Sequence, residues 1–201
     1  ANEVRDAMRE HLYRADLKRF ARSINPRDDG EFDIDATIDA SLFGVFYFGA
    51  FDPNDPVVVE TMKAVEFRLW AKTEIGGLGR YEDDGYMRVA NDTQKVPGNP
   101  WFICTLWLAD YRIAAAQTLE ELESALLILE WVVARALPSG VLAEQVDPIT
   151  GAPVSVSPLT WSHSTVVATV MNYLRKLEAL LNCDTCKRPL FRYDRRARRV
   201  Y

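Results

Sequence analysis

The sequence lacks the features of several protein classes. It has only three cysteines among 201 residues, and an odd number argues against a disulfide scaffold and favours a reducing compartment. No apolar run approaches the roughly 18 residues that a membrane-spanning helix needs. The N-terminus does not resemble a signal peptide and carries no initiator Met. We therefore expect a cytoplasmic protein that does not enter a membrane, processed or cut from a longer chain.

Positive charge is also scarce, because 24 Lys and Arg oppose 29 Asp and Glu, which gives a net charge of −5. Such a balance gives no overall electrostatic support for nucleic-acid binding and suits neutral or cationic ligands. Hydrophobic residues make up 48% of the chain and charged residues 26%. This composition is typical of a globular protein with one sizeable domain or two small ones.

Apolar spacing predicts six helices and no convincing strand, so the expected fold class is all-α. Two starts carry explicit signals: Asp55 before Pro56 is a plausible N-cap, and Thr118 with Glu121 fits a capping box. Asn99 is a further candidate N-cap. For the second helix a strand is the competing interpretation, because that segment is rich in β-branched and aromatic residues. The expected helices span about 2–23, 35–49, 56–72, 99–116, 118–136 and 162–181.

The lengths of the connections indicate how these helices are arranged. The loops after the first, third and fifth helices are long, and the other two are short. In a stack of antiparallel helices, alternate connections emerge at the same end. We therefore expect the three long loops to cluster at one rim. The second, fourth and sixth helices should form an inner apolar layer that the other three cover.

The predicted rim collects acids, aromatic rings and planar polar groups, a set that suits a polyhydroxylated ligand such as a sugar. Glu144 lies in an apolar setting within the long loop 139–163, so it is a candidate general base. Glycoside hydrolysis needs a second carboxylate as well. The alternatives are a solvated Glu144, an ion pair between Arg80 and the acidic run 82–84, and plain core packing of Trp101 and Trp161.

Four motifs in the second half of the chain resemble the glucoamylases, family 15 of the glycoside hydrolases. They are GRYEDDGY at 79–86, GNPWFICTL at 98–106, GVLAEQ at 140–145 and PLTWS at 158–162. The resemblance implies a six-hairpin α/α toroid with its active site at the rim. It also implies an inverting exo-acting α-glucosidase that needs no metal or other cofactor. Since the chain has six expected helices, it resembles about half of such a toroid, the C-terminal half.

The resemblance also implies roles for individual residues. Glu144 matches the catalytic base that activates water, Arg80, Tyr81 and Asp84 match residues that hold the terminal glucose, and Trp101 matches an aromatic of that pocket. Trp161 leads the helix that follows the base-bearing loop and is a further substrate-binding candidate. The family's general acid sits in a Trp-Glu setting, and no glutamate in this chain directly follows a tryptophan. We therefore expect the isolated chain to be inactive.

The partners expected for such a chain are an α-glucan or small glucoside, the missing N-terminal half of the toroid, and a second copy bound through exposed apolar helix flanks. A trehalase or an α-1,6-glucosidase of the same family is an alternative function. A non-catalytic sugar-binding or assembly module is another.

The expected domain organisation is a toroid half at 1–181 followed by a basic tail at 182–201. Cys183 and Cys186 have the spacing of half a zinc site, but a closed site needs four ligands, so zinc is the weaker interpretation and free thiols the alternative.

Overall fold

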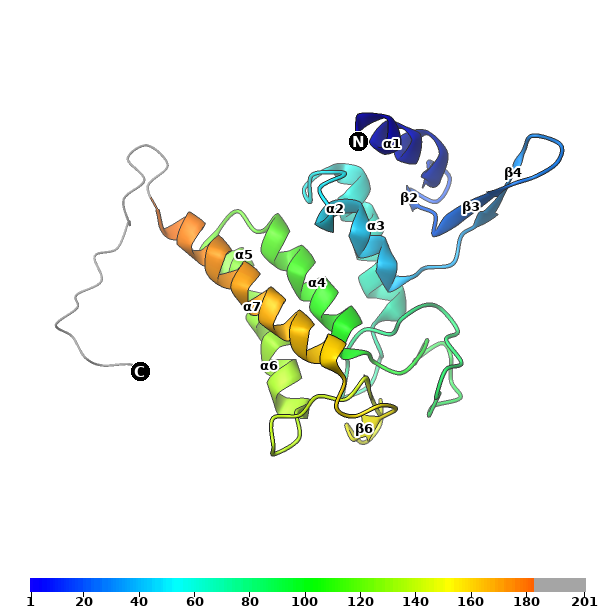
Figure 1. The fold of residues 1–201 in the computed structure, drawn as a ribbon. Coiled ribbons are helices and arrows are strands. Elements are labelled where there is room, and N and C mark those ends of the chain that lie inside the picture. Colours follow the sequence, from blue (N-terminus) through cyan, green and yellow to red (C-terminus); the bar gives the residue numbers. More distant parts are fainter. Residues whose placement is uncertain (183–201) are drawn as a thin grey trace.

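A computed structural model describes residues 1–182 of the chain and shows a helix-rich fold with three small two-stranded sheets (Figure 1). Within this part, no helix combines the length and the apolar character needed to cross a membrane. The elements, in chain order, are α1 (Asn2–Ala7), a π-helical turn (Met8–Leu12), β1 (Tyr13–Arg14), β2 (Arg19–Phe20), β3 (Ser23–Pro26), β4 (Phe32–Asp35), a 3₁₀ turn (Ala40–Phe43), α2 (Gly44–Tyr47), α3 (Pro56–Leu69), α4 (Phe102–Ala115), α5 (Leu119–Glu123), α6 (Leu126–Arg135), β5 (Gln145–Val146), β6 (Pro153–Val154) and α7 (Thr160–Leu181).

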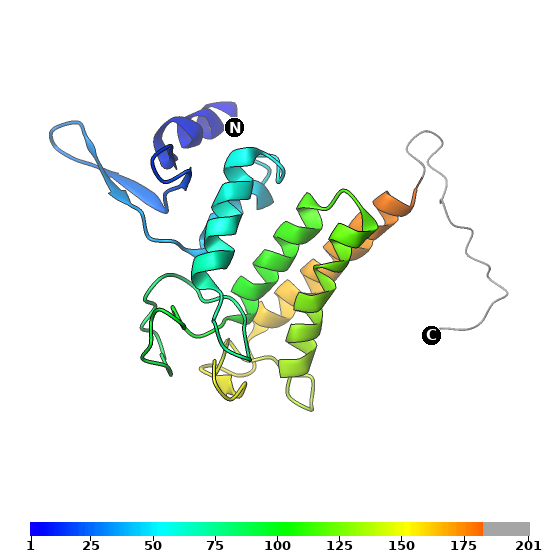
Figure 2. The same cartoon turned by 180° about the vertical axis from the view of Figure 1, so that it is seen from behind.

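Helix α4 is the centre of the fold. It lies between α3 on one side and α6 and α7 on the other, as the front and back views show (Figures 1 and 2). Nine of its fourteen residues are buried, among them Cys104, Leu106 and Leu108. A helix that is apolar on most sides can exist in water only when neighbours cover it. The expected inner position of this helix is therefore confirmed.

The first predicted helix is wrong after its second turn. Helical structure ends at Leu12, and the segment to Asp35 forms two antiparallel hairpins, β1–β2 and β3–β4. Phe20 is fully buried, and its backbone N–H donates to the hydroxyl of Thr61 on α3 at 3.1 Å. Burial of this ring in the core outweighs the helical spacing of the residues before it. Because the described residues form three two-stranded sheets, the prediction of a chain without strands is also wrong.

The second predicted helix is much shorter than 35–49. It consists of the 3₁₀ turn 40–43 and the single turn of α2, and the strand alternative is wrong here. The aromatic side chains that made the segment look apolar pack across to α4, where Phe43 stacks on Trp107 with ring centroids 4.2 Å apart. Tertiary packing, not helix length, accounts for the run of aromatic residues.

Two of the predicted helix starts are confirmed. The Asp55 carboxylate accepts the Val57 N–H at 3.1 Å, and Thr118 and Glu121 form a reciprocal capping box. The helix that begins at Thr118 is interrupted after Glu123 and resumes as α6. Asn99 is not a cap, because α4 begins after Trp101 and the Asn99 side chain bonds elsewhere.

Two of the three long loops, those that carry Arg80 and Glu144, meet at one end of the helices, as their lengths predict. The first predicted loop, at about 24–34, instead lies in the β3–β4 hairpin, which projects away from that end (Figure 1). Residues 38–40 pair with 80–82: the Ala40 N–H donates to the Arg80 carbonyl at 2.7 Å and the Glu82 N–H to the Ile38 carbonyl at 3.0 Å. On the other side, the Val146 N–H donates to the Pro100 carbonyl at 2.9 Å. The loop 73–101 therefore contacts both the segment 38–40 and the loop that bears Glu144.

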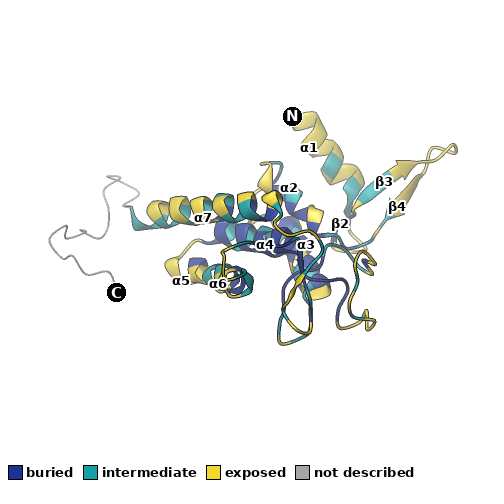
Figure 3. Cartoon of the chain, turned by 60° about the horizontal axis from the view of Figure 1, so that its bottom comes forward, coloured by how far each residue is buried: buried dark blue, intermediate teal, exposed yellow. Residues whose placement is uncertain are grey.

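Helix α7 departs from the predicted inner apolar helix. Its buried residues, Ser162, Thr165 and Thr169, all carry hydroxyl groups. Val166 and Leu177 of this helix pack against buried clusters, whereas other apolar residues form a stripe on its exposed side. Figure 3 shows exposed residues along this helix. This α7 stripe is half exposed and comprises Val167, Val170, Met171 and Leu174.

The joint between α4 and α7 contains a buried acid. Asp110 is 3% exposed and accepts hydrogen bonds from Thr169 Oγ1 at 3.1 Å and Asn172 Nδ2 at 3.0 Å. Burial raises the pKa of Asp110, because a low-dielectric setting disfavours the carboxylate, and the two hydrogen bonds offset this only in part. The ionised acid therefore weakens the joint.

This joint predicts a pH-dependent effect of Asp110→Asn. Above its ordinary pKa of 3.8 the unfolded chain releases the proton that the folded chain retains, so stability falls as pH rises through the raised folded pKa. The variant lacks this ionisation. Urea unfolding at pH 4 to 7 should show its free energy of unfolding rising relative to the wild type as pH increases.

Asp147→Asn is the matched control of opposite sign. Burial raises the pKa of Asp147, but the N–H groups of Ile149 and Thr150 outweigh burial and lower it. This variant should lose stability relative to the wild type as pH rises from the lowered folded pKa toward 3.8, so the difference between the two should be nearly constant over most of pH 4 to 7. A pH-independent difference for Asp110→Asn would contradict the account of the joint.

Candidate functional site

The site is built around an ion pair inside the loop 73–101. The Arg80 guanidinium donates to both oxygens of Asp84, from Nε and from Nη2, each at 2.9 Å. The Asp84 side chain is 1% exposed, whereas that of Arg80 is 33% exposed. Burial alone would lower the pKa of Arg80, but the hydrogen bonds and charge of Asp84 outweigh it and raise the pKa. Arg80 therefore stays a cation with one face open.

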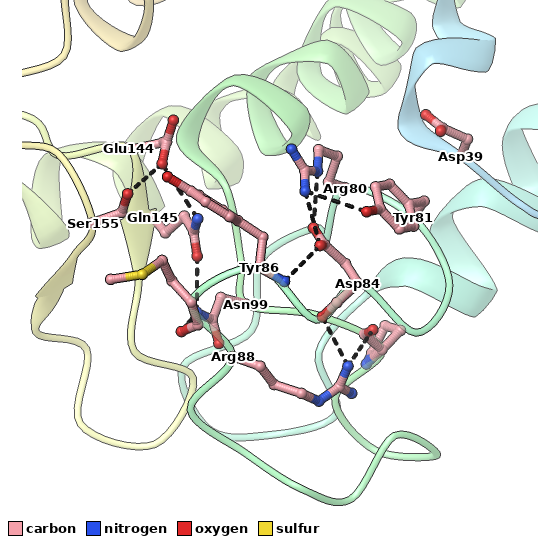
Figure 4. A network of polar contacts seen from close by, with 12 residues as sticks. Asp39, Arg80, Tyr81, Asp84, Tyr86, Arg88, Asn99, Glu144, Gln145 and Ser155 are labelled. Carbon is pink, nitrogen blue, oxygen red and sulfur yellow. Dashed lines mark hydrogen bonds and ion pairs between the residues drawn. The ribbon is translucent and has the colours of Figure 1, made fainter.

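Aromatic rings enclose this guanidinium. Its carbon lies 4.5 Å from the ring centroid of Trp101, 4.8 Å from that of Tyr81 and 5.4 Å from that of Tyr86. Figure 4 shows Arg80 with the two tyrosines. Such contacts favour a cation by electrostatic attraction to the ring faces. Together, the bidentate acid and the three rings fix the direction in which Arg80 can bind a ligand.

Gly98 to Trp101 connects the two sides of the site. A Cβ at Gly98 would lie 2.9 Å from Cβ of Asp84, so only glycine allows the buried acid to approach this closely. The Trp101 N–H donates to the Leu78 carbonyl at 2.9 Å, and Trp101 also forms an antiparallel bridge with Gln145. The Trp101 indole N–H is buried and has no hydrogen-bond partner among the described residues.

Glu144 stands on the other side of this junction, in the loop between α6 and α7. Its Oε2 accepts from the Ser155 hydroxyl at 2.5 Å and from Gln145 Nε2 at 3.3 Å. Ser155 adopts a left-handed conformation with φ of 64°, which is uncommon for a residue other than glycine. Within the described part of the chain, no group is hydrogen-bonded to Oε1. The carboxylate is therefore held by one oxygen and free at the other.

A buried amide pair supports Glu144 from behind. Gln145 is 0% and Asn99 1% exposed. Asn99 Nδ2 donates to Gln145 Oε1 at 2.8 Å and to the Met87 carbonyl at 2.7 Å, and Asn99 Oδ1 accepts the Val89 N–H at 3.1 Å (Figure 4). The pair therefore links the stretch after Asp84 to the carboxylate.

Sequence comparison now decides the family. The model of "Glycosyl hydrolases family 15" matches residues 18–171, most of the chain. The chain belongs to glycosyl hydrolase family 15. An uncharacterized glycosyl hydrolase of Methanocaldococcus jannaschii is 33% identical over 165 residues, which cover 77% of this chain and 24% of the relative. A glucoamylase of a Clostridium species is 29% identical over 143 residues, covering 69% of this chain and 20% of the relative.

Solved structures agree at the level of the fold. A bacterial glucoamylase complexed with acarbose matches 79% of this chain and 25% of its own, with a TM-score of 0.62 and 23% identity. A family 15 glucoamylase of Hypocrea jecorina matches 92% of this chain and 40% of its own, with a TM-score of 0.60 and 17% identity. The chain thus spans about a quarter of its curated relatives and less than half of these structures.

The structure places most of the predicted family 15 residues together. One cluster contains Arg80, Tyr81, Asp84 and Trp101. Glu144 directly precedes Gln145, which forms the bridge to Trp101. The alternative predicted for Arg80, an ion pair with the acidic run 82–84, is present in the structure. Its partner in that run is Asp84, whereas Glu82 accepts a hydrogen bond from Arg68.

Trp161 and His163 lie apart from this cluster. Trp161 is 52% exposed and packs edge-on against Trp107, with centroids 5.9 Å apart. No contact joins it to Arg80 or Asp84 among the described residues. His163, the last residue of the predicted loop 139–163, accepts the Leu142 N–H at 3.0 Å and so has a structural role.

Sequence reasoning missed the groups that hold Glu144. Gln145 and Ser155 were not candidates, and Asn99 was assigned to a helix start. Gln145 directly follows Glu144, but a neutral side chain in a loop gives no charge or spacing signal. The zinc candidates Cys183 and Cys186 lie outside the described residues.

The close approach at Gly98 yields a prediction about stability. Gly98→Ala should cost about 1–3 kcal/mol, because the added methyl group must displace the buried Asp84 from Arg80. Gly85→Ala is the control in the same loop, since nothing lies within 4 Å of a Cβ there; it should change stability by less than about 0.5 kcal/mol. Denaturant unfolding of both variants checks this, and equal effects would contradict it.

Proposed function

We propose that this chain is the base-bearing part of an inverting, exo-acting α-glucosidase of the glucoamylase type. The observation that carries the proposal is Glu144: one carboxylate oxygen is hydrogen-bonded and the other is free, on a loop that pairs directly with Trp101. In an inverting glycosidase, a general base must ionise and face water on one side of the sugar. A half-held carboxylate suits that task.

The roles of the other residues follow from their chemistry. Arg80, with Asp84 behind it, offers a fixed fork of N–H donors to sugar hydroxyls, while Tyr81 and Trp101 provide ring faces for C–H groups. The unpaired indole N–H of Trp101 is a group whose partner could arrive with the ligand. Trp161, exposed and apart from Arg80, is at most a contact for a more distant part of a glucan.

The proposed substrate is an α-glucan or a small glucoside, and the general acid is supplied by sequence outside this chain. Maltose, isomaltose and trehalose assayed side by side distinguish a glucoamylase from an α-1,6-glucosidase and a trehalase. Arrangement as the C-terminal half of a six-hairpin toroid at 1–181, with 182–201 as a tail, is part of the same proposal. A cytoplasmic location stays a prediction.

The proposed base predicts the effect of Glu144→Gln. In a protein that carries the complete catalytic domain, glucose release from maltooligosaccharides should fall by about 10²–10⁴-fold, the usual contribution of a general base. Asp147→Asn is the control, because this acid lies in the same loop but is committed to the N–H groups of Ile149 and Thr150. Residues 1–201 alone should release no glucose. Glu144-dependent release by residues 1–201 would overturn the missing-acid proposal, and full activity of Glu144→Gln would overturn the base.

The α7 stripe suggests where the rest of the domain binds. Burying a Val, Leu or Met side chain contributes about 1.5–3 kcal/mol, so four half-exposed ones leave several kcal/mol unrealised. Because the chain spans about a quarter of its curated relatives, we infer that the remaining part of such a domain covers this stripe. Without that part, two copies can cover each other.

This inference predicts self-association of residues 1–201. Light scattering should show a mass above 22.8 kDa that grows with concentration. Replacing Met171 and Leu174 together with Glu should restore the monomer. Val4→Glu, on exposed α1, is the control and should not change the mass. A concentration-independent monomer for the wild type would contradict the prediction.

A further inference from the structure

The buried amide pair behind Glu144 has only one orientation that satisfies its neighbours. The Val89 N–H can only donate, so the Asn99 atom that faces it must be the oxygen, Oδ1. The Met87 carbonyl can only accept, so the atom facing it must be the nitrogen, Nδ2. The backbone of 87–89 therefore fixes the Asn99 amide without reference to Glu144.

The same logic extends to the next residue. Asn99 Nδ2 directs its second hydrogen to Gln145 at 2.8 Å, so Gln145 must present its oxygen there. Its nitrogen, Nε2, is then the atom that faces Glu144 Oε2, at 3.3 Å. Both amides are almost completely buried, so water cannot substitute for a partner of either. An inverted Gln145 would leave two donors facing each other at Asn99 and two acceptors facing each other at Glu144.

We propose that Asn99 is a positioning residue that acts through Gln145, forcing a donor N–H onto one oxygen of Glu144 so that the other oxygen stays free for water. The backbone after Asp84 thereby sets the state of a carboxylate on a different loop. The catalytic consequence rests on the proposed role of Glu144 as base, whereas the orientation of the two amides does not.

Asn99→Asp is the informative change because it keeps size and the acceptor toward Val89 but removes the donor. Gln145 is then expected to turn its nitrogen toward position 99 and its oxygen toward Glu144. In the complete catalytic domain, kcat should fall at least tenfold while KM stays within about threefold, since Arg80, Asp84 and Trp101 keep their contacts. Arg88→Lys is the control. The Arg88 side chain donates to the backbone carbonyls of Asp84, Val96 and Pro97 but makes no hydrogen bond to Gln145, so kcat should be retained.

NMR spectroscopy tests the orientation of the Gln145 amide without an enzyme assay. In NMR spectra of residues 1–201, Glu144→Gln should shift the side-chain amide signals of Gln145. In an Asn99→Asp background the same change should shift them much less, because the nitrogen no longer faces position 144. Equal shifts in both backgrounds would overturn the proposed relay, in which Asn99 orients Gln145 and Gln145 donates to Glu144.

If Asn99→Asp does not fold, the wild-type background still decides: Gln145 amide signals that ignore Glu144→Gln rule the relay out. A relay confirmed by NMR together with a fully active Glu144→Gln enzyme would instead overturn only the proposed function.

Discussion

The candidate site depends on the backbone pairing of Gly98–Trp101 with the loops on both sides of it. Trp101 donates its N–H to Leu78, which precedes Arg80, and bridges to Gln145, which follows Glu144. One short segment therefore sets the distance between the Arg80 cluster and the proposed base. The indole of Trp101 under Arg80 and the amide of Asn99 behind Gln145 add side-chain contacts to the same junction. Two loops that are separated in sequence by α4, α5 and α6 thus behave as one structure.

Sequence patterns predicted this meeting of loops because the argument used only helix direction, which does not depend on exact helix ends. They failed at 13–23, where the chain forms strands and the buried Phe20 bonds to α3 instead of continuing the expected helix. Caps at Asp55 and Thr118 were predictable since they are local, involving neighbours within three residues. The Phe43–Trp107 stack was not, because it joins segments that only the fold brings together.

The same distinction separates the parts of the site. Charged and aromatic members, such as Arg80 and Trp101, could be predicted because their chemistry and family motifs are visible in the sequence. Gln145 and Ser155 gave no such signal, and their importance comes from where each hydrogen points relative to Glu144. An acid in a loop can be recognised from the sequence as a candidate catalytic residue. Which of its two oxygens is left without a hydrogen bond depends on the groups that the fold brings next to it.

Helix α7 carries this dependence beyond the residues that touch Glu144. Its inward side joins α4 through hydroxyl groups and the buried Asp110, whose ionisation weakens the joint, while its apolar stripe faces outward. Ser162, at the start of this helix, donates to the Ala143 carbonyl at 2.8 Å, and His163 accepts from Leu142. The loop that bears Glu144 is therefore anchored to the helix that also carries the exposed α7 stripe. The contacts that hold the Glu144 loop and the stripe that is left exposed are therefore parts of one helix.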